Sequence, residues 1–306
     1  MNHVLGSGII TPMLTPLNED ESVNYKHLTA LVDHLIEGGI KSILSMGSSG
    51  EFARFDHHIR GEILKRTVES VAGRASVFAG VSDAGLLAVL RNVESAEKSG
   101  ADAIVLTLPY YFPIYNDDEA YSFFSSVASS TKLPVFLYDI PKTCGASISL
   151  DTIDKLFNIK NIVGIKDSSG NFEKLRELLS RYKNKGKDFA VVLGDESLCF
   201  DGLLAGIDGI VPSLSNPYPK LFVDIYETSK SGDESKLRGL CNVVKQMNEI
   251  NAYCNAWMSP NVWRKKALSH MGICNDYCTK PYVPIDPKTD LQIQETIKLY
   301  KIMYKG

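Results

Sequence analysis

The amino-acid sequence predicts a (β/α)8 barrel, the α/β fold usually called a TIM barrel, followed by a C-terminal helical extension. The first observation is that short apolar, β-branched runs alternate with amphipathic stretches of helical period. The second is that these runs are continuously apolar, which is typical of strands buried on both faces of a parallel sheet. The third is their number, because eight of them fall within about 230 residues. We expect strands at residues 8–14, 40–46, 77–81, 103–108, 134–138, 162–166, 189–193 and 209–211.

Residues 25–37 show the helical half of the repeating unit. Their apolar residues recur at the spacing of one buried helical face, and these are Leu28, Leu31, Val32, Leu35 and Ile36. Gly38 and Gly39 can end this helix, because glycine adopts the left-handed conformation at little steric cost. The same cycle recurs at residues 86–99, with Gly100 as the terminator before the next apolar run.

An open, doubly wound sheet is the rival architecture for this alternation. Its G-x-G-x-x-G dinucleotide fingerprint does not follow the first strand, and the Gly-Ser-Ser-Gly of residues 47–50 does not match it. Beyond Pro217 the strand pattern ends, and helical patterns cover residues 220–230, 234–251, 262–271 and 291–303. We therefore expect the barrel to occupy residues 1–230 and a helical extension, packed on the barrel, to occupy residues 231–306.

The composition excludes several classes of protein. Lys and Arg total 33 against 36 for Asp and Glu, a net charge of −3, whereas a protein that binds nucleic acid would carry a concentrated basic excess. No apolar run approaches the roughly 18 residues needed to cross a bilayer. The apolar content of 44% is enough for a substantial core. We expect a cytoplasmic globular protein with no nucleic-acid and no membrane partner.

The cysteines and histidines predict no metal site. Six cysteines are too dilute in 306 residues for a disulfide framework. Cys274 and Cys278 form the one close pair, and no second Cys or His pair follows at zinc-ligand spacing. The six histidines do not cluster as ligands either. A metal-dependent mechanism therefore has little support in the sequence, and the thiols are expected to be reduced.

Polar residues collect where the predicted strands end. In a barrel of this kind the active site lies at the carboxyl ends of the strands. The polar residues at these positions are Thr11, Thr15, Ser48, Ser49, Glu51, Tyr110, Tyr111, Tyr138, Asp139, Lys166, Asp167, Asp195, Glu196 and Ser213. We draw the candidate site from this set.

Lys166 stands out because it ends the apolar run 161–165, so its stem points into the barrel. Burial would deprive its ammonium of hydration and favour the neutral amine, the nucleophile that forms Schiff bases with carbonyl substrates. An ion pair with Asp167 or another carboxylate is the alternative. Tyr138 ends another apolar strand, where its hydroxyl can relay protons. A core tyrosine with one satisfied hydroxyl is the commoner role for such a residue.

Residues 47–51, Gly-Ser-Ser-Gly-Glu, follow the second predicted strand. Two hydroxyls and several backbone N–H groups on a glycine-flanked turn can hold a small carboxylate. By itself this segment is no more specific than any other tight turn.

Taken together, these segments resemble the dihydrodipicolinate synthase/N-acetylneuraminate lyase family, the lysine-dependent pyruvate aldolases built on a (β/α)8 barrel. Residues 47–51 are similar to the family's Gly-(Ser/Thr)-Thr-Gly-Glu element, and residues 138–145 to its Tyr-Asn-x-Pro-x-x-x-Gly element. Residues 164–167 are similar to the segment that bears the Schiff-base lysine. The resemblance covers nearly the whole chain. It departs from the family at Asp139, where asparagine is usual, and at Ser49, where threonine is usual.

The resemblance implies a class I aldolase with no cofactor beyond the lysine itself. Lys166 would attack the C2 ketone of a 2-keto acid, and the protonated imine would accept electrons as the C3–C4 bond breaks. Gly47, Ser48 and Ser49 would hold the substrate carboxylate through backbone N–H groups and hydroxyls. Tyr138 would move the proton between imine formation and the C4 hydroxyl.

A second tyrosine from a neighbouring subunit completes this relay in the family. Tyr111 fits that position, with Ser49 as the bridge. The resemblance therefore implies at least a dimer, and family members are commonly homotetramers, built as dimers of dimers.

The choice of substrate depends on a few positions. Dihydrodipicolinate synthases resemble Tyr-Asn-x-Pro-Ser-Arg-Thr-Gly, in which the arginine helps to bind a second carboxylate. In this sequence Thr143 occupies the position of that arginine, which disfavours a dicarboxylate product. Lys142 could compensate for the missing charge, but a lysine there is more often a solvated surface cation. Residues 109–113 resemble the 2-keto-3-deoxygluconate aldolases. Some relatives that accept the 6-phospho substrate carry an arginine at the position of Ile114, so we expect a preference for the unphosphorylated sugar acid.

Asp195, Glu196 and Ser213 lie where the lyase branch of the family contacts substrate hydroxyls. N-acetylneuraminate lyase is therefore the second candidate, and dihydrodipicolinate synthase the third. Asp195 fits equally well as a cap of the helix that begins at Ser197. The alternative from another class is a barrel that binds keto acids as a regulatory protein without turnover.

Overall fold

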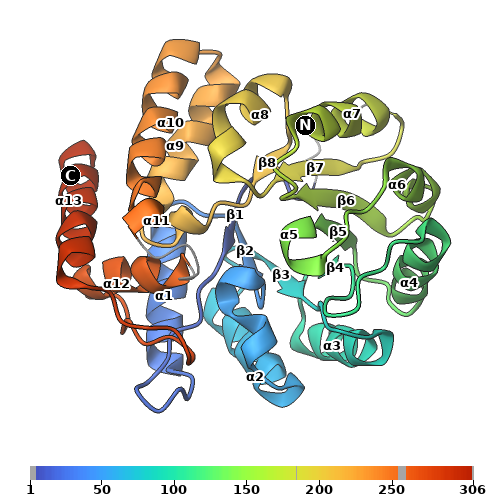
Figure 1. Ribbon diagram of the computed structural model, residues 1–306, viewed down its shortest axis with the longest axis horizontal. Helices are drawn as coiled ribbons and strands as arrows, with labels where there is room; N and C mark the ends of the chain where they lie inside the picture. The colour runs from blue at the N-terminus through green and yellow to red at the C-terminus, as the bar shows by residue number, and fades with distance from the viewer. Residues whose placement is uncertain (1–4, 184, 254–259, 305–306) are drawn as a thin grey trace.

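The computed structural model describes residues 5–183, 185–253 and 260–304. Within these ranges eight parallel strands close into a barrel in sequence order, which confirms the predicted (β/α)8 fold (Figure 1). The strands are β1 (Gly8–Pro12), β2 (Ser42–Ser45), β3 (Ser76–Gly80), β4 (Ala103–Thr107), β5 (Val135–Asp139), β6 (Ile162–Asp167), β7 (Ala190–Leu193) and β8 (Gly209–Ile210). No helix in the described ranges is long and apolar enough to span a membrane.

A helix follows every strand and returns the chain to the next one. These helices are α1 (Tyr25–Glu37), α2 (His57–Val71), α3 (Leu86–Ser99), α4 (Asp117–Ser129), α6 (Leu150–Phe157), α7 (Phe172–Tyr182), α8 (Cys199–Ala205) and α9 (Pro219–Ser231). In α1 the expected stripe forms the buried face, because Leu28, Leu31, Val32 and Leu35 are fully buried. Asn24 caps this helix by accepting a hydrogen bond from the His27 N–H.

Two strands are shorter than expected by more than one residue, because their end residues bond outside the sheet. β2 begins at Ser42 rather than at residue 40, since the Ile40 N–H donates to the Leu35 carbonyl at 3.0 Å and closes α1. β1 ends at Pro12, and the Leu14 N–H donates instead to Asn216 Oδ1 at 3.0 Å. Local apolar content does not reveal such bonds.

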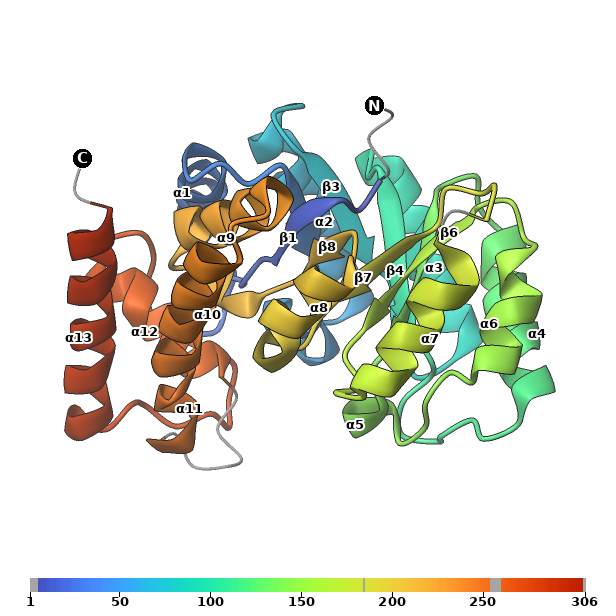
Figure 2. The ribbon, with the colours of Figure 1, turned by 90° about the horizontal axis from the view of Figure 1, so that it is seen from above.

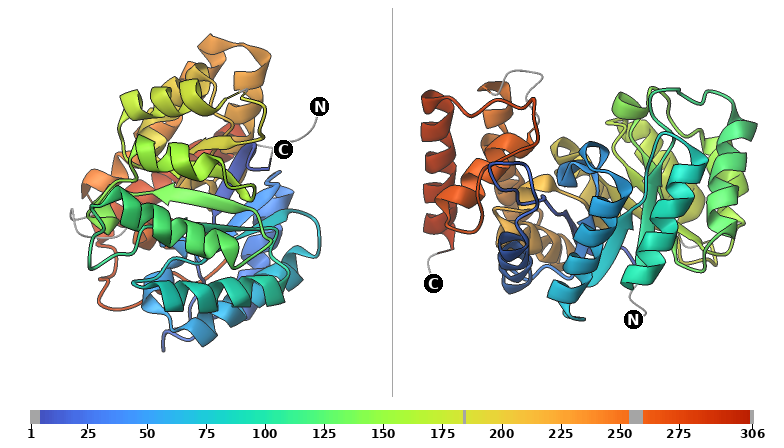
Figure 3. Two further views of the ribbon diagram at one scale, coloured as in Figure 1. Left: turned by 90° about the vertical axis from the view of Figure 1, so that its right-hand side faces the viewer. Right: turned by 90° about the horizontal axis from the view of Figure 1, so that it is seen from below.

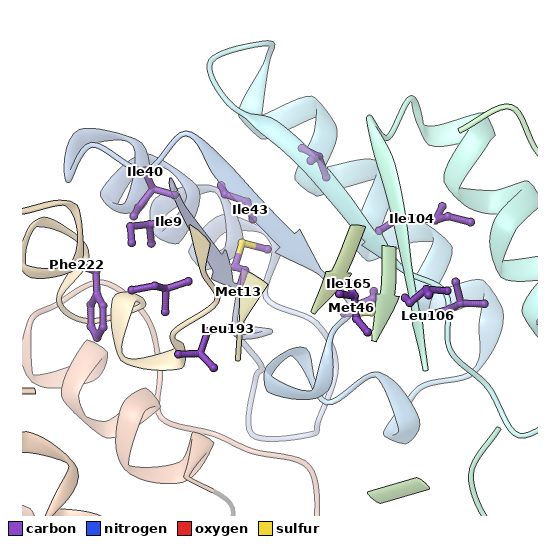
Figure 4. Close-up of a cluster of buried hydrophobic side chains, with 14 of the residues drawn as sticks. Ile9, Met13, Ile40, Ile43, Met46, Ile104, Leu106, Ile165, Leu193 and Phe222 are labelled. Carbon is purple, nitrogen blue, oxygen red and sulfur yellow. The ribbon is translucent and has the colours of Figure 1, made fainter. Parts of the chain in front are cut away.

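The core has two layers, one inside the barrel and one between the barrel and its helices. The inner layer includes Ile10, Leu44, Phe78, Val105, Phe136 and Val192. Gly164 leaves room for the Phe136 ring, which a Cβ at 164 would overlap. Figure 4 shows part of the outer layer, where Ile43, Ile104 and Ile165 point from their strands toward the surrounding helices.

The helical extension continues from α9 without a separating strand. It contains α10 (Glu234–Asn248), α11 (Ile250–Tyr253), α12 (Asn261–His270) and α13 (Pro287–Met303). α10 packs against α9 and α12 packs against α13 (Figure 2). α13 lies at the outer edge, on the side opposite α4 and α6 (Figures 1 and 3). The division of the chain after residue 230 stays a prediction.

Two extension helices differ from the sequence prediction. The single helix expected at 234–251 is split into α10 and α11. α13 begins four residues earlier than the apolar pattern indicates, at Pro287 instead of 291. Asp286 explains the second difference, because its carboxylate accepts hydrogen bonds from the N–H groups of Lys288 and Thr289 and so caps the helix.

Candidate active site

Lys166 and Tyr138 face each other at the carboxyl end of the barrel. They are register partners on β6 and β5, and Lys166 Nζ lies 3.9 Å from the centroid of the Tyr138 ring. Each residue is only 6% exposed. Since a cation within about 6 Å of an aromatic face is attracted to it, the ring helps to hold the amine in place.

The structure offers Lys166 no ion-pair partner among the described residues. Asp167, the partner that the sequence suggests, accepts a hydrogen bond from the Ser169 N–H at 2.8 Å instead. Burial raises the pKa of the Asp167 carboxyl group, although the hydrogen bonds from Ser169 oppose that rise. The ion-pair alternative for Lys166 gains no support, and its role as nucleophile stays a prediction.

The hydroxyl of Tyr138 makes no hydrogen bond to another group in the parts of the chain that the structure describes. A structural core tyrosine would normally place its hydroxyl on a partner. Tyr138 therefore has a polar atom at the barrel end that is free to meet a ligand, beside the amine of Lys166.

Gly194 lies beside Lys166 and is not among the residues predicted from the sequence. It follows β7, and a Cβ at this position would lie 2.7 Å from Lys166 Cε and would overlap Ser168 Oγ. A side chain at this position would therefore require Ser168 and the lysine stem to move. The available signal is a glycine directly after an apolar strand, at the end of the barrel where polar residues collect.

The Gly-Ser-Ser-Gly turn (residues 47–50) follows β2 as the short 3-10 helix η1 (Ser48–Gly50). Asn261 Nδ2 donates to the carbonyl oxygens of Ser49 at 3.1 Å and Ser48 at 3.4 Å. The N–H groups and hydroxyls of these two serines make no hydrogen bond to the described residues. The turn thus presents unsatisfied donors, which is what binding of a carboxylate requires.

Glu51 anchors the turn to the helical extension. Its Oε1 lies 2.6 Å from Lys265 Nζ on α12, and both side chains are almost completely buried. Its Oε2 accepts hydrogen bonds from Thr279, from the N–H at 3.0 Å and from Oγ1 at 2.7 Å. Three of these anchoring residues are not predicted from the sequence, namely Asn261, Lys265 and Thr279. For Lys265 a signal exists, since it lies on the apolar stripe of α12, three residues from Leu268.

Tyr111 is 82% exposed and has a positive φ of 80°. Phe112 and Tyr115 beside it are 76% and 78% exposed, an unusual concentration of uncovered aromatic surface. Positive φ is costly for a residue with a side chain, so the backbone is constrained here. Within the described chain Tyr111 makes no hydrogen bond to Ser49, its expected bridge.

A cavity of about 460 Å³ adjoins the turn. Its lining includes Ser48, Arg54, Thr107, Tyr111 and Thr143. Lys166 and Tyr138 are not among its lining residues. Tyr111 and Ser48 therefore line the same cavity, whereas Lys166 and Tyr138 lie in the interior of the barrel.

Asp195, Glu196 and Ser213 are engaged with other groups of the chain. Asp195 Oδ1 accepts hydrogen bonds from the Ser197 N–H at 2.9 Å and from its hydroxyl at 2.7 Å, which is the helix-capping alternative. Glu196 Oε1 accepts from the Ser213 hydroxyl at 3.0 Å, and its Oε2 accepts from Asn248 Nδ2 on α10 at 2.9 Å. A substrate hydroxyl would have to compete with these partners.

The described residues contain no group of three or more His, Cys, Asp or Glu side chains that could hold a metal ion. Burial raises the pKa of Cys274 and that of Cys278 to about 12. Thiols held in the protonated form are poor metal ligands, because the thiolate is the species that binds.

Comparison with known proteins agrees with the family that the motifs indicate. The family model described as the dihydrodipicolinate synthetase family matches residues 6–300. The 4-hydroxy-tetrahydrodipicolinate synthase of Neisseria meningitidis serogroup B is 29% identical over 291 residues, covering 95% of this chain and 97% of that protein. The enzyme of the same name from Bartonella bacilliformis is 30% identical over 284 residues, covering 92% of this chain and 94% of the relative.

Solved structures share the fold over nearly the full length of the chain. A dihydrodipicolinate synthase from Bacteroides thetaiotaomicron superposes with a TM-score of 0.90 at 29% identity, covering 98% of this chain and 100% of that one. A Clostridium difficile structure described as CdNal in complex with mannosamine gives a TM-score of 0.89 at 20% identity, covering 96% of this chain and 99% of that one, which is a likeness of fold.

The enzymes of the matched family are carbon–carbon lyases. They act through a lysine Schiff base with pyruvate and use no external cofactor. The barrel, its C-terminal helices and the match over nearly the whole length together show that this chain belongs to the dihydrodipicolinate synthetase family and is a pyruvate-dependent class I lyase of that family.

Proposed function

We propose that this lyase cleaves 2-keto-3-deoxy sugar acids, with 2-keto-3-deoxygluconate as the substrate and pyruvate and glyceraldehyde as the products. The observation that carries the proposal is Thr143, at the position where dihydrodipicolinate synthases carry a carboxylate-binding arginine. Thr143 lines the cavity and its Oγ1 donates to the Ile140 carbonyl at 3.3 Å. A threonine offers no positive charge to a second carboxylate, so a substrate with neutral hydroxyls suits this wall better.

Lys166 is the proposed nucleophile. Its amine adds to the C2 ketone, and loss of water leaves a protonated imine that accepts the electrons of the breaking C3–C4 bond. Tyr138 takes the proton from the C4 hydroxyl as the aldehyde leaves. Support comes from the 3.9 Å separation of the amine from the ring and from the space that Gly194 leaves beside the lysine stem.

The Gly-Ser-Ser-Gly turn is the proposed carboxylate site. Ser48 and Ser49 supply hydroxyls and N–H groups, and Gly47 supplies backbone without a side chain in the way. The unsatisfied donors of the two serines support this role. The hydroxyls of the sugar chain are proposed to contact Asp195, Glu196 and Ser213. These contacts would replace some of the hydrogen bonds that the three residues make within the chain.

Tyr111 is proposed to act in the site of a second copy of the chain, through Ser49 of that copy. Members of this family are typically oligomeric. The exposure of Tyr111 and of its neighbours Phe112 and Tyr115 supports a subunit contact at this surface. We propose a homotetramer built as a dimer of dimers.

Ile114 supports the preference for the unphosphorylated acid. Its side chain packs against the outer core and carries no charge. Ile114 therefore offers no positive charge to a phosphate dianion bound beside it.

Dihydrodipicolinate synthase, the third candidate from the sequence, becomes the second candidate. It is favoured by the names of the relatives and by Arg54, whose guanidinium lies in the cavity lining above the Tyr282 ring at 5.3 Å from its centroid. Arg54 could take over the second carboxylate that Thr143 cannot bind.

Two measurements test the proposal. Borohydride reduction with pyruvate should add one pyruvate-derived mass to Lys166, and Lys166→Ala should give no adduct. The kcat/KM values for 2-keto-3-deoxygluconate, its 6-phosphate, N-acetylneuraminate and the dicarboxylate-forming condensation of pyruvate should rank the first highest. If the adduct forms but the condensation has the highest kcat/KM of these reactions, the protein is a dihydrodipicolinate synthase and not a sugar-acid aldolase. Absence of any adduct would favour a barrel that binds keto acids without turnover.

A further inference from the structure

Asp139 carries a negative charge where the family usually has a neutral asparagine, and the structure shows what balances it. Lys174, in the first turn of α7, places its Nζ 2.5 Å from Asp139 Oδ2. The side chain of Asp139 is 1% exposed and that of Lys174 is 12% exposed, so both charges are largely withdrawn from water. A buried carboxylate without a cation would be strongly unfavourable.

The same pair holds the loop that follows β5. Lys174 Nζ also donates to Ser147 Oγ at 2.8 Å and to the Ile148 carbonyl at 2.6 Å, which uses all three ammonium protons. Asp139 accepts hydrogen bonds from Ser147 Oγ at 2.8 Å and from the Ile148 N–H at 3.0 Å. Both charges therefore bind the same two loop residues.

The loop in question, residues 140–148, forms one wall of the cavity. It contains the short helix α5 (Pro141–Cys144), and both Thr143 and Cys144 line the cavity. Cys144 Sγ donates to the Leu108 carbonyl at 3.3 Å, which joins this wall to the end of β4. The position of the wall thus depends on its attachment at residues 147 and 148.

We propose that Lys174 is a positioning residue for the lyase reaction, because its ammonium balances Asp139 and with it fixes the loop that carries Thr143. This inference rests on the proposed function of the site. Asp167 and Cys144 are two further titratable groups on which the charge of Asp139 acts, and neither can supply a positive charge. Lys174 is thus the cation on which the loop relies.

The test compares three variants. Lys174→Met should lower kcat/KM for the preferred keto acid at least tenfold, since it leaves Asp139 charged and unbalanced. Asp139→Asn/Lys174→Met removes both charges and should recover most of that loss. Lys155→Met is the matched control, because Lys155 pairs with Asp118 at 2.9 Å on the surface, at 51% and 88% side-chain exposure. It should leave kcat/KM unchanged.

A second measurement does not depend on the reaction. Hydrogen exchange should accelerate in residues 140–148 of Lys174→Met and return toward the original rate in the double variant. If the parent protein forms no pyruvate adduct, the proposed function fails while this exchange result still decides the role of the pair. The inference is overturned if folded Lys174→Met keeps its kcat/KM within twofold and its exchange rate, or if the double variant does no better than the single one.

Discussion

At the scale of the residue, Gly194 leaves the space that the end of the Lys166 side chain needs inside the barrel. The hydrogen of this glycine occupies a position from which a methyl group would press on Lys166 Cε at 2.7 Å. A lysine at the end of an apolar strand can be recognised from sequence, because the break in apolar character is local. The glycine cannot be recognised so easily, since its role comes from a neighbouring strand nearly thirty residues later in the chain.

Gly194→Ala should lower kcat at least tenfold, because the lysine must leave its present rotamer to make room for the new methyl group. The change is measured by steady-state kinetics and by the rate of the borohydride-trapped pyruvate adduct. Gly239→Ala is the control, since Gly239 lies in α10 with open space around it. It should leave kcat unchanged and stabilise the helix by up to ~1 kcal/mol. An unchanged adduct rate in Gly194→Ala would contradict the steric argument.

At the scale of the element, α12 is the helix that holds the turn at the carboxyl end of β2. It delivers Asn261 to the carbonyl oxygens of the Gly-Ser-Ser-Gly turn and Lys265 to Glu51. The helical pattern of residues 262–271 is visible in the sequence, but its attachment to the turn is not. Glu51 and Thr279 are separated by 228 positions, and periodicity carries no information about such a pairing.

Lys265→Met should destabilise the fold by about 3–5 kcal/mol, because it leaves Glu51 charged and buried without its cation. The free energy of unfolding in urea measures this loss. The folded fraction should also bind pyruvate more weakly, as the turn loses its support. For comparison, Lys298→Met breaks an exposed pair with Glu295 and should change stability very little. Equal effects of the two substitutions would contradict the assigned role of the buried pair.

At the scale of the whole molecule, the barrel was predictable and the completed site was not. Eight buried strands separated by helices have essentially one closed parallel arrangement, so counting the apolar runs was enough. Lys166, Tyr138 and the turn could be selected as candidates because each interrupts or follows such a run. The anchors at Lys174, Lys265 and Thr279 were missed, because they are polar residues whose importance comes from distant partners.

The proposed contribution of Tyr111 to a neighbouring subunit predicts complementation. Lys166→Ala and Tyr111→Phe homo-oligomers should both be nearly inactive. A mixed oligomer contains sites with Lys166 from one chain and Tyr111 from the other, so co-expression should restore a substantial part of the activity. Assays on the purified hetero-oligomer measure it, with the parental homo-oligomers as references. Persistent inactivity of the mixture would place Tyr111 in the site of its own subunit, and an active Tyr111→Phe homo-oligomer would place it outside the chemistry.

The hydrogen bonds of Glu51 to Thr279 have a consequence for biosynthesis. A ribosome adds Glu51 to the chain 228 positions before Thr279, so the segment that is proposed to receive the keto acid lacks one of its supports until that stretch of chain has been added. Premature termination between Ser213 and Thr279 would yield a polypeptide that contains every proposed site residue and still lacks this support of the segment proposed to hold the substrate carboxylate.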